Sequence, residues 1–448
     1  MTRSTLSRRG FLGAATGLVY AAGSSTFTRA GDQPPVTNPR ATSGDDLHEP
    51  DWDERLTISV GPKNADILGQ SDKPIQAAVD YVARLGGGTV RLVPGTYTFR
   101  NAVYLSSHVR LVGAGNDTVL VKNPSNQVKL TADSDWYDQE ITLEPGHGFE
   151  VGDGICLQAR NPHNGSQEVI KRTLVSRSGD RFKLDRALRK NLWLSGEPTA
   201  ANLFPLLSGE RNSDVVIENL TLDGNRANNA NLNGNYAGCI FLQDCNRYHI
   251  RNVTAHHYNG DGISWQICHD VIVENCHSHD NAGLGLHPGS GSQRPVMRSN
   301  KLDRNNLGLF FCWGVKFGLA EKNTIDGNQT YGISIGHCDT DNVIRDNTIT
   351  NSGKVGILFR DADRGQDFWP HRNRVERNRI IDSGSNDGIA IDVQGRTRDV
   401  TIARNELRET RGPSERTGIR VGAETRGVQL SENRLEGFAV DVVDNRTA

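Results

Sequence analysis

Residues 262–286 read G-I-S-W-Q-I-C-H-D-V-I-V-E-N-C-H-S-H-D-N-A-G-L-G-L, one complete unit of a repeat that fills the second half of this 448-residue chain. A Gly-Ile pair opens the unit, and a short apolar pair leads to an asparagine further along. Such asparagines recur every 23 to 33 residues, and a repeat of this length with one turn residue per period indicates a solenoid. The nine positions are Asn219, Asn252, Asn275, Asn300, Asn323, Asn347, Asn378, Asn405 and Asn433.

Each repeat is typical of a series of short strands. Apolar residues alternate with period two around the Gly-Ile pairs, so that one face of each strand points inward, and helical periodicity is absent. Such strands, stacked coil on coil, predict an all-β fold, a right-handed parallel β-helix. Asparagine suits the turns because its amide bonds to the backbone of neighbouring coils and because it tolerates a left-handed backbone. We therefore interpret the nine asparagines as one turn ladder.

The N-terminal segment carries a different signal. Residues 7–12, S-R-R-G-F-L, precede an apolar stretch over residues 13–22 and resemble a twin-arginine export signal. That resemblance implies export to the periplasm or the cell exterior. We expect a signal peptide over residues 1–30, a flexible linker over residues 31–55 and the β-helix over residues 56–445. No other stretch approaches ~20 apolar residues, so no membrane span is expected.

The balance of charged residues limits the kind of partner that the protein could bind. The formal net charge is −2, from 51 basic and 53 acidic residues, which argues against a nucleic-acid-binding stripe. The seven cysteines lie mostly inside repeat strands, where small buried thiols are expected, although Cys239 and Cys245 are near enough in sequence to pair. We expect a monomer.

The repeat is preceded by a predicted cap. Residues 72–85 place apolar side chains on one helix face, with Asp72 as the expected N-cap, and Gly86-Gly87-Gly88 end the helix. A strand follows over residues 89–93. The helix would cover the open first coil and shield its edge from solvent. The apolar face consists of Ile75, Ala78, Val79, Val82 and Leu85.

The cap and coils together, over roughly residues 70–445, resemble the pectate-lyase-like β-helix superfamily. This group includes polygalacturonases, pectate and alginate lyases, mannuronan C5-epimerases and phage tailspikes, so the resemblance implies the fold and a carbohydrate ligand but not one reaction. Residues 133–207 interrupt the repeat. Segments 149–155 and 181–185 there are expected to be strands of a small antiparallel insertion, which either walls a cleft or is purely structural.

Outward positions of successive coils form columns, because each coil rises about 4.8 Å on the last. The turns that flank the Gly-Ile strand are rich in polar and aromatic residues, whereas the other turns carry mainly Asn, Gly and Ser. This difference indicates a candidate site beside the Gly-Ile strands. We predict catalytic roles for His287, Lys316, His337 and Arg360, and substrate binding by Gln266, Trp313, Asp361, Asp363 and Arg364.

β-Elimination at a uronic acid needs a group that neutralises the carboxylate, a base for the C5 proton and an acid for the leaving oxygen. C5-epimerisation would use the same groups. His287 stands where Pro288 and Gly289 break a strand, and it is the first candidate base. The Arg360 guanidinium suits bidentate pairing with a carboxylate, unless it pairs with Asp361 or Asp363.

Two other functions stay open. Residues 259–263, N-G-D-G-I, resemble the N-T-D-G motif of polygalacturonases, which implies a glycoside hydrolase that uses Asp261 and Asp280. The chain departs from that pattern at Asn281 and lacks the expected Gly-His-Gly, and Asp261 alone could cap a turn. The third possibility is a non-catalytic glycan-binding or surface solenoid. The sequence indicates no definite cofactor, although Ca²⁺ could bind the hard oxygen ligands Asp339, Asp341, Asp361 and Asp363.

Overall fold

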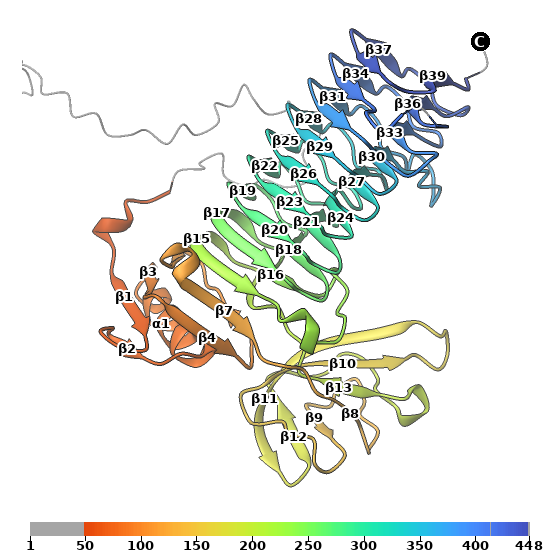
Figure 1. Cartoon of the computed structure of the whole chain (residues 1–448). Coiled ribbons are helices and arrows are strands. Elements are labelled where there is room, and N and C mark those ends of the chain that lie inside the picture. Colours follow the sequence, from red (N-terminus) through yellow and green to blue (C-terminus); the bar gives the residue numbers. More distant parts are fainter. Residues whose placement is uncertain (1–48, 413, 447–448) are drawn as a thin grey trace, which may run out of the picture.

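The computed structural model describes residues 49–412 and 414–446, which form a long stack of coils with one lateral insertion (Figure 1). An 11-stranded parallel sheet, here called the front sheet, holds the Gly-Ile strands. Its strands are β5 (Val103–Tyr104), β14 (Leu207–Glu210), β16 (Gly238–Gln243), β18 (Asp261–Gln266), β21 (Leu284–Gly289), β24 (Leu307–Phe310), β27 (Tyr331–Ile335), β30 (Val355–Phe359), β33 (Ile389–Val393), β36 (Thr417–Val421) and β39 (Val440–Asp444).

A 22-stranded sheet, here called the back sheet, closes each coil. Its first strands are β1 (Thr57–Gly61), β2 (Ile67–Leu68), β3 (Gly88–Leu92), β4 (Gly95–Phe99), β6 (Val109–Val112), β7 (Thr118–Lys122), β15 (Ser213–Asp223) and β17 (Asn246–His256). Later coils divide this side into two short strands. They are β19 (Ile272–Glu274), β20 (His277–His279), β22 (Val296–Arg298), β23 (Lys301–Asp303), β25 (Leu319–Glu321), β26 (Thr324–Asp326), β28 (Val343–Arg345), β29 (Thr348–Thr350), β31 (Arg374–Glu376), β32 (Arg379–Ile381), β34 (Thr401–Ala403), β35 (Glu406–Arg408), β37 (Gln429–Ser431) and β38 (Arg434–Glu436).

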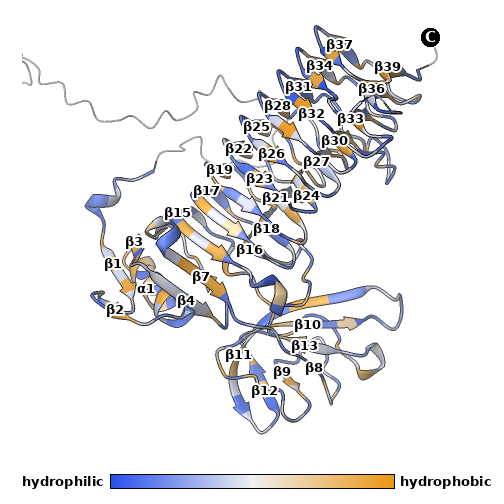
Figure 2. Ribbon diagram, in the orientation of Figure 1, coloured by the Kyte–Doolittle hydropathy of each residue, from blue (hydrophilic) through white to orange (hydrophobic). Residues whose placement is uncertain are grey.

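The predicted alternation of apolar residues builds the core. Ile263, Leu286, Leu309 and Ile333 pair in register and are fully buried. Apolar residues lie as short stripes on the strands, separated by polar positions (Figure 2). Because each strand contributes alternate side chains to one continuous interior, the period-two pattern is sufficient to form the coil.

The predicted asparagine ladder is present, but only six of the nine predicted asparagines belong to it. In the later coils the stacked amides run from Asn300 to Asn433, and the Asn347 side chain accepts from the Asn323 backbone N–H at 3.0 Å. The other three asparagines precede the ladder position of their coils by one residue and have φ between 52° and 55°. They are Asn219, Asn252 and Asn275. The prediction that they belong to the same ladder is therefore wrong. They occupy a left-handed bend, a conformation that asparagine tolerates.

The capping helix α1 (Asp72–Arg84) covers the first coils as predicted, with Ile75 and Val82 fully buried. Two details differ. Ser71 is the N-cap, and the Asp72 side chain instead accepts the backbone N–H of Arg100 at 3.0 Å. Leu85 lies beyond the helix and is 58 % exposed, because the chain turns into the glycines before that side chain can reach the core.

The insertion is a six-stranded antiparallel sheet with its own apolar core, and it protrudes beside the first coils (Figure 1). Its first strand begins at Gln127, and residues 149–153 form a turn, so only the 181–185 segment closely matches a predicted strand. The strands are β8 (Gln127–Lys129), β9 (Glu140–Thr142), β10 (Gly154–Arg160), β11 (Gln167–Ser178), β12 (Arg181–Leu184) and β13 (Thr199–Ala201). Short 3₁₀ turns occur at Trp52–Glu54, Gly115–Asp117, Leu194–Gly196 and Arg226–Asn228.

Part of the expected linker is packed on the back sheet. The Glu49 carboxylate accepts from Arg251 at 2.7 Å and contacts His249, and Trp52 is buried. The expected signal peptide, residues 1–30, lies outside the described residues. No disulfide joins the seven cysteines, all of which lie in the described residues, and Cys245 lies against Cys268, with a 3.4 Å contact from its backbone N–H to Sγ, rather than pairing with Cys239.

Candidate active site

The front sheet brings Asp261 and His287 together on its outer face. The Asp261 carboxylate contacts His287 Nδ1 at 2.8 Å through Oδ2 and accepts the Leu284 backbone N–H at 2.9 Å through Oδ1. Ser264, which pairs in register with His287, lies 3.3 Å from the same Nδ1. An ionised carboxylate can only accept, so this contact places the imidazole proton on Nδ1 and leaves the lone pair on Nε2.

This pair is enclosed, although the sequence predicted an outward histidine. Both side chains are only 3 % exposed. Residues 224–237, between β15 and β16, cross the outside of the pair, and Ser264 donates to the Gly234 carbonyl at 2.9 Å. A Cβ at Gly234 would lie 1.7 Å from the Asp261 carboxylate, so only glycine fits there. His287 Nε2 is buried without a hydrogen-bond partner.

Arg360 reaches back along the same face toward His287. Its guanidinium carbon lies 4.2 Å from the Phe310 ring centroid, and that ring meets His287 edge-on at 5.4 Å. Arg360 donates to Ser334 Oγ at 2.6 Å and to the Phe311 carbonyl at 2.9 Å. Phe310 therefore separates the positive charge from the imidazole.

The nearest carboxylate to Arg360 is Asp339, 3.8 Å away, rather than Asp361 or Asp363. Asp339 is completely buried and accepts the backbone N–H groups of Val315 at 2.8 Å and Gly336 at 2.9 Å. Burial raises the pKa of its carboxyl to about 7, against the opposing effect of Arg360 and the backbone donors. The sequence predicted Asp339 only as a calcium ligand, because nothing in the repeat reveals its burial.

A second group lies in the turns beyond the strand ends. The rings of Trp313 and His337 are 5.3 Å apart, and the Arg364 guanidinium lies 5.7 Å from the Trp313 ring. Burial, with the positive charges of Arg360 and Arg364, lowers the pKa of His337 to about 4. Trp313 is 45 % exposed and so presents an apolar surface at the rim of the front sheet. His337 is thus a neutral rim residue rather than a cation.

Several predicted site residues lie apart from this group. Lys316 pairs through its backbone with Gln293 and Thr340 in the turn toward the back sheet. Asp280 contacts Arg304 at 2.8 Å and His279 at 2.6 Å, which lowers the pKa of its carboxyl, and no described contact joins it to Asp261.

The remaining predicted binding residues have local partners. Gln266 lies inside the site and donates to Ser264 at 3.1 Å. Asp361 accepts the Trp369 indole N–H at 2.8 Å. Asp363 and Trp369 line a separate groove beside the C-terminal coils.

The four proposed calcium ligands do not converge. Asp339 and Asp361 are held by the donors described above, and Asp341 pairs with Arg372 at 2.7 Å. Among the described residues, a group of three potential metal ligands occurs only at Asp223, His256 and His257.

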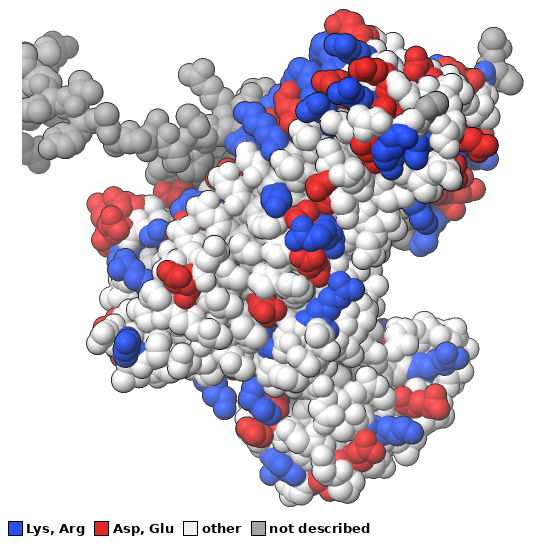
Figure 3. Space-filling view, in the orientation of Figure 1, with Lys and Arg blue, Asp and Glu red and all other residues white. Residues whose placement is uncertain are grey.

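The insertion contributes residues that the sequence did not reveal. The surface is hollowed between the insertion and the solenoid (Figure 3). A cleft of about 300 Å³ lies between β11 and the outer face of β14 and β16. Its charged lining comprises Lys171, Arg172, Arg186, Arg189, Lys190 and Glu210. Register joins this cleft to the enclosed pair, because Ser208, Phe241, Ser264 and His287 follow one another across neighbouring strands.

Two cations of the cleft have no carboxylate within salt-bridge distance among the described residues, although Glu210 attracts both. Arg172 donates to the carbonyl oxygens of Ala187 and Leu188, and it has no carboxylate partner in the described part of the chain. Lys171 Nζ lies 3.8 Å from the Phe241 ring centroid and donates to the Tyr236 carbonyl. Burial lowers the pKa of Lys171 to about 8. The cleft is therefore suited to an anion.

Comparisons with known proteins agree on the architecture. A family model described as a right-handed beta helix region matches residues 208–368. The mannuronan C-5 epimerase AlgE4 A-module of Azotobacter vinelandii superposes with a TM-score of 0.52 at 14 % identity, covering 87 % of this chain and all of that module. The surface protein and adhesin PfbA of Streptococcus pneumoniae gives 0.50 at 13 % identity, covering 83 % of this chain and 95 % of that one.

A third structure, ORF18 of Geobacillus virus E2, gives a TM-score of 0.51 at 13 % identity and covers 86 % of this chain and 62 % of that protein. No curated protein sequence matches the chain. No helix in the described residues has the length and apolar character needed to cross a bilayer. The stacked coils, the family-model match and these likenesses confirm the predicted architecture: the chain is a right-handed parallel β-helix.

Proposed function

We propose that this protein is an exported enzyme that acts on an acidic, uronate-containing polysaccharide by β-elimination or by C5-epimerisation. One observation carries the proposal. A cleft rich in cations leads, through a single column of front-sheet residues, to an Asp261–His287 pair with an unpartnered imidazole nitrogen. Repeated carboxylates on the substrate would be held by the cations, and a basic nitrogen is what removal of a carbon-bound proton requires.

The roles follow from the contacts. His287 would take the C5 proton through Nε2, and in the elimination the C4–O bond would break as the C4–C5 double bond forms, with the protonated imidazole returning the proton to the leaving oxygen. Asp261 would be a positioning residue that orients the ring and stabilises its charged form. Arg172 and Lys171 would bind uronate carboxylates in the cleft. Arg360 would place a positive charge beside the sugar whose proton is removed, which stabilises the developing enolate.

The pair must open for this chemistry. Phe310 packs on His287 and is partly exposed, whereas the 224–237 segment is fixed by its bond from Ser264. Rotation of the Phe310 ring would uncover Nε2 on the side of Arg360. A bound sugar would then replace the ring.

The hydrolase alternative has less support. It needs two carboxyl groups that flank one glycosidic oxygen, at a separation of roughly 5 to 9.5 Å. Asp280 is engaged by Arg304 and His279, while Asp261 is engaged by His287. A second candidate function, glycan binding without catalysis, is favoured by the enclosure of Nε2.

A spectrophotometric assay on a panel of polyuronates and neutral polysaccharides separates these functions. A lyase produces an unsaturated uronate that absorbs in the ultraviolet, together with new reducing ends. An epimerase changes uronate composition without either signal. New reducing ends without ultraviolet absorbance would overturn the proposal in favour of hydrolysis. Affinity for polyuronate with no chemical change in any substrate would overturn it in favour of binding.

A further inference from the structure

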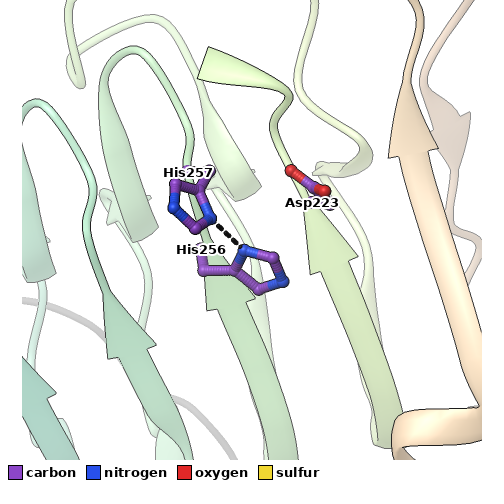
Figure 4. Close-up of side chains that lie close together, drawn as sticks. All are labelled: Asp223, His256 and His257. Carbon is purple, nitrogen blue, oxygen red and sulfur yellow. Dashed lines mark hydrogen bonds between the residues drawn. The ribbon is translucent and has the colours of Figure 1, made fainter. Parts of the chain in front are cut away.

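A separate group of side chains converges where two back-sheet strands end. Asp223 closes β15, His256 closes β17, and the two residues pair in register. His257 follows with φ of 50°, and this left-handed bend turns its ring toward His256, whereas consecutive side chains of a regular strand point to opposite faces (Figure 4). One potential ligand atom from each of the three residues lies within 4.8 Å of the other two.

The nitrogen atoms of this group converge. Nδ1 of His256 and Nδ1 of His257 share a hydrogen bond at 2.5 Å, so one of them carries the proton, and a bound divalent cation would take the place of that proton between the two nitrogens. The His256 ring stacks on the His279 ring with their centroids 5.0 Å apart. Asp223 is oriented by the Asn225 backbone N–H, which donates to Oδ1 at 2.8 Å.

We propose that Asp223, His256 and His257 form a binding site for a borderline divalent transition metal such as Zn²⁺. Two imidazoles and one carboxylate match the ligand preference of that class of ion, whereas Ca²⁺ prefers oxygen ligands alone. Three protein ligands leave a fourth tetrahedral position for water. The site lies on the back-sheet edge, and none of its three residues takes part in the proposed reaction on the front sheet.

The position of the site gives the metal a structural role. Residues 224–237 begin immediately after Asp223, and the Gly224 backbone N–H donates to the His256 carbonyl at 2.9 Å. The same segment ends over Asp261, where Gly234 accepts from Ser264. A metal bound to both neighbouring strands would fix the origin of the segment that encloses the Asp261–His287 pair.

Titration calorimetry of the full chain, stripped with a chelator and then titrated with ZnCl₂, tests the site. We expect one Zn²⁺ per chain, and we expect His256→Ala, His257→Ala and Asp223→Asn each to weaken binding by about tenfold or more. His277→Ala is the matched control. That imidazole contacts Asp303 in the neighbouring coils and should leave Zn²⁺ affinity unchanged.

Two results would overturn the site. One is the absence of saturable Zn²⁺ binding to the stripped wild-type protein. The other is wild-type affinity in the three ligand variants with loss in His277→Ala, which would place the metal elsewhere. Circular dichroism of each variant establishes that it is folded, and Asp223→Asn, which keeps a side-chain acceptor, is the variant expected to perturb folding least. Co²⁺ substitution gives an independent readout, since a bound ion of the expected geometry has a visible absorption band that the variants should lose. Neither readout uses a polysaccharide, so failure here leaves the proposed reaction untouched.

Discussion

At the scale of single residues, the site depends on how Asp261 holds His287. Asp261→Asn keeps the shape but can donate from its amide, so that the imidazole is no longer held with its proton on Nδ1. We expect kcat to fall by a factor of about 10² to 10⁴ with little change in KM, because general-base catalysis supplies a contribution of that size. Steady-state kinetics on the active polyuronate measure this. An unchanged kcat would exclude the pair from the chemistry.

Asp339 gives a pH prediction. Its carboxyl has a pKa raised by burial to about 7, against 3.8 in the unfolded chain. Below about pH 4 both states hold the proton, and between about pH 4 and pH 7 only the folded state keeps it, so folding stability falls as the pH rises through this window. The loss is of the order of 4 kcal/mol above pH 7.

Asp339→Asn cannot ionise and should escape this loss. Its amide loses one of the two backbone N–H bonds, a cost that does not change with pH, so the measurable effect is the difference between the two unfolding midpoints, which should shift in favour of the variant as the pH rises from about 4 to about 7. Unfolding scans of both proteins across this range check the point. If the unfolding midpoints of the two proteins changed with pH in parallel, the folded-state pKa of Asp339 would not be raised.

At the scale of elements, the asparagine ladder stabilises the coils through completed hydrogen bonds. Asn347→Ala would leave the Asn323 backbone N–H and the Ala320 carbonyl without their side-chain partner. Buried polar groups without partners cost about 1–3 kcal/mol each, so we expect a loss of about 3 kcal/mol in the free energy of unfolding. Asn275→Gly is the matched control, since glycine accepts the φ of 52° there and the change should stay within about 0.5 kcal/mol. Denaturant unfolding compares the two, and equal losses would contradict the division of the asparagines into two sets.

The ladder also shows what the sequence could and could not predict. Counting from the Gly-Ile pairs placed His287 on the outer face of the front sheet, because strand register transfers from coil to coil. It did not reveal that Asp261, at the start of the preceding strand, contacts His287. The sequence pattern also assigned Asn275 and Asn300 to the same ladder. The two residues differ by one position within their coils, so that Asn275 lies in a left-handed bend and Asn300 in the buried stack, yet the surrounding sequence looks the same. The sequence placed Asp280 in the site because it shows which coil a turn residue belongs to. It does not show whether the side chain of that residue points toward the front sheet or the back sheet.

At the scale of the whole molecule, the insertion determines the charge of the site. Lys171 could not be predicted, because its position depends on how a separate sheet packs against the coils. The protein as a whole is nearly neutral, with a formal net charge of −2, yet its cleft is cationic, and charged side chains elsewhere gather on the C-terminal coils (Figure 3).

A charge test follows from this contrast. Arg172→Gln should raise KM for a polyuronate by about tenfold, the effect of one lost charge-assisted hydrogen bond, and it should weaken the dependence of KM on salt. Arg379→Gln removes a half-exposed arginine of the back sheet and should change neither quantity. Equal effects of the two substitutions would show that binding senses only overall charge.

The most direct test of the account is proton NMR of a polyuronate incubated with the protein in deuterium oxide. Removal of the C5 proton should give either unsaturated uronate ends or inverted, deuterated C5 positions. We predict that His287→Ala abolishes these signals, whereas His163→Ala, on the exposed surface of the insertion, retains them. Wild-type signals from His287→Ala, or chain cleavage by the wild type with C5 unchanged, would contradict C5-proton removal on the front sheet.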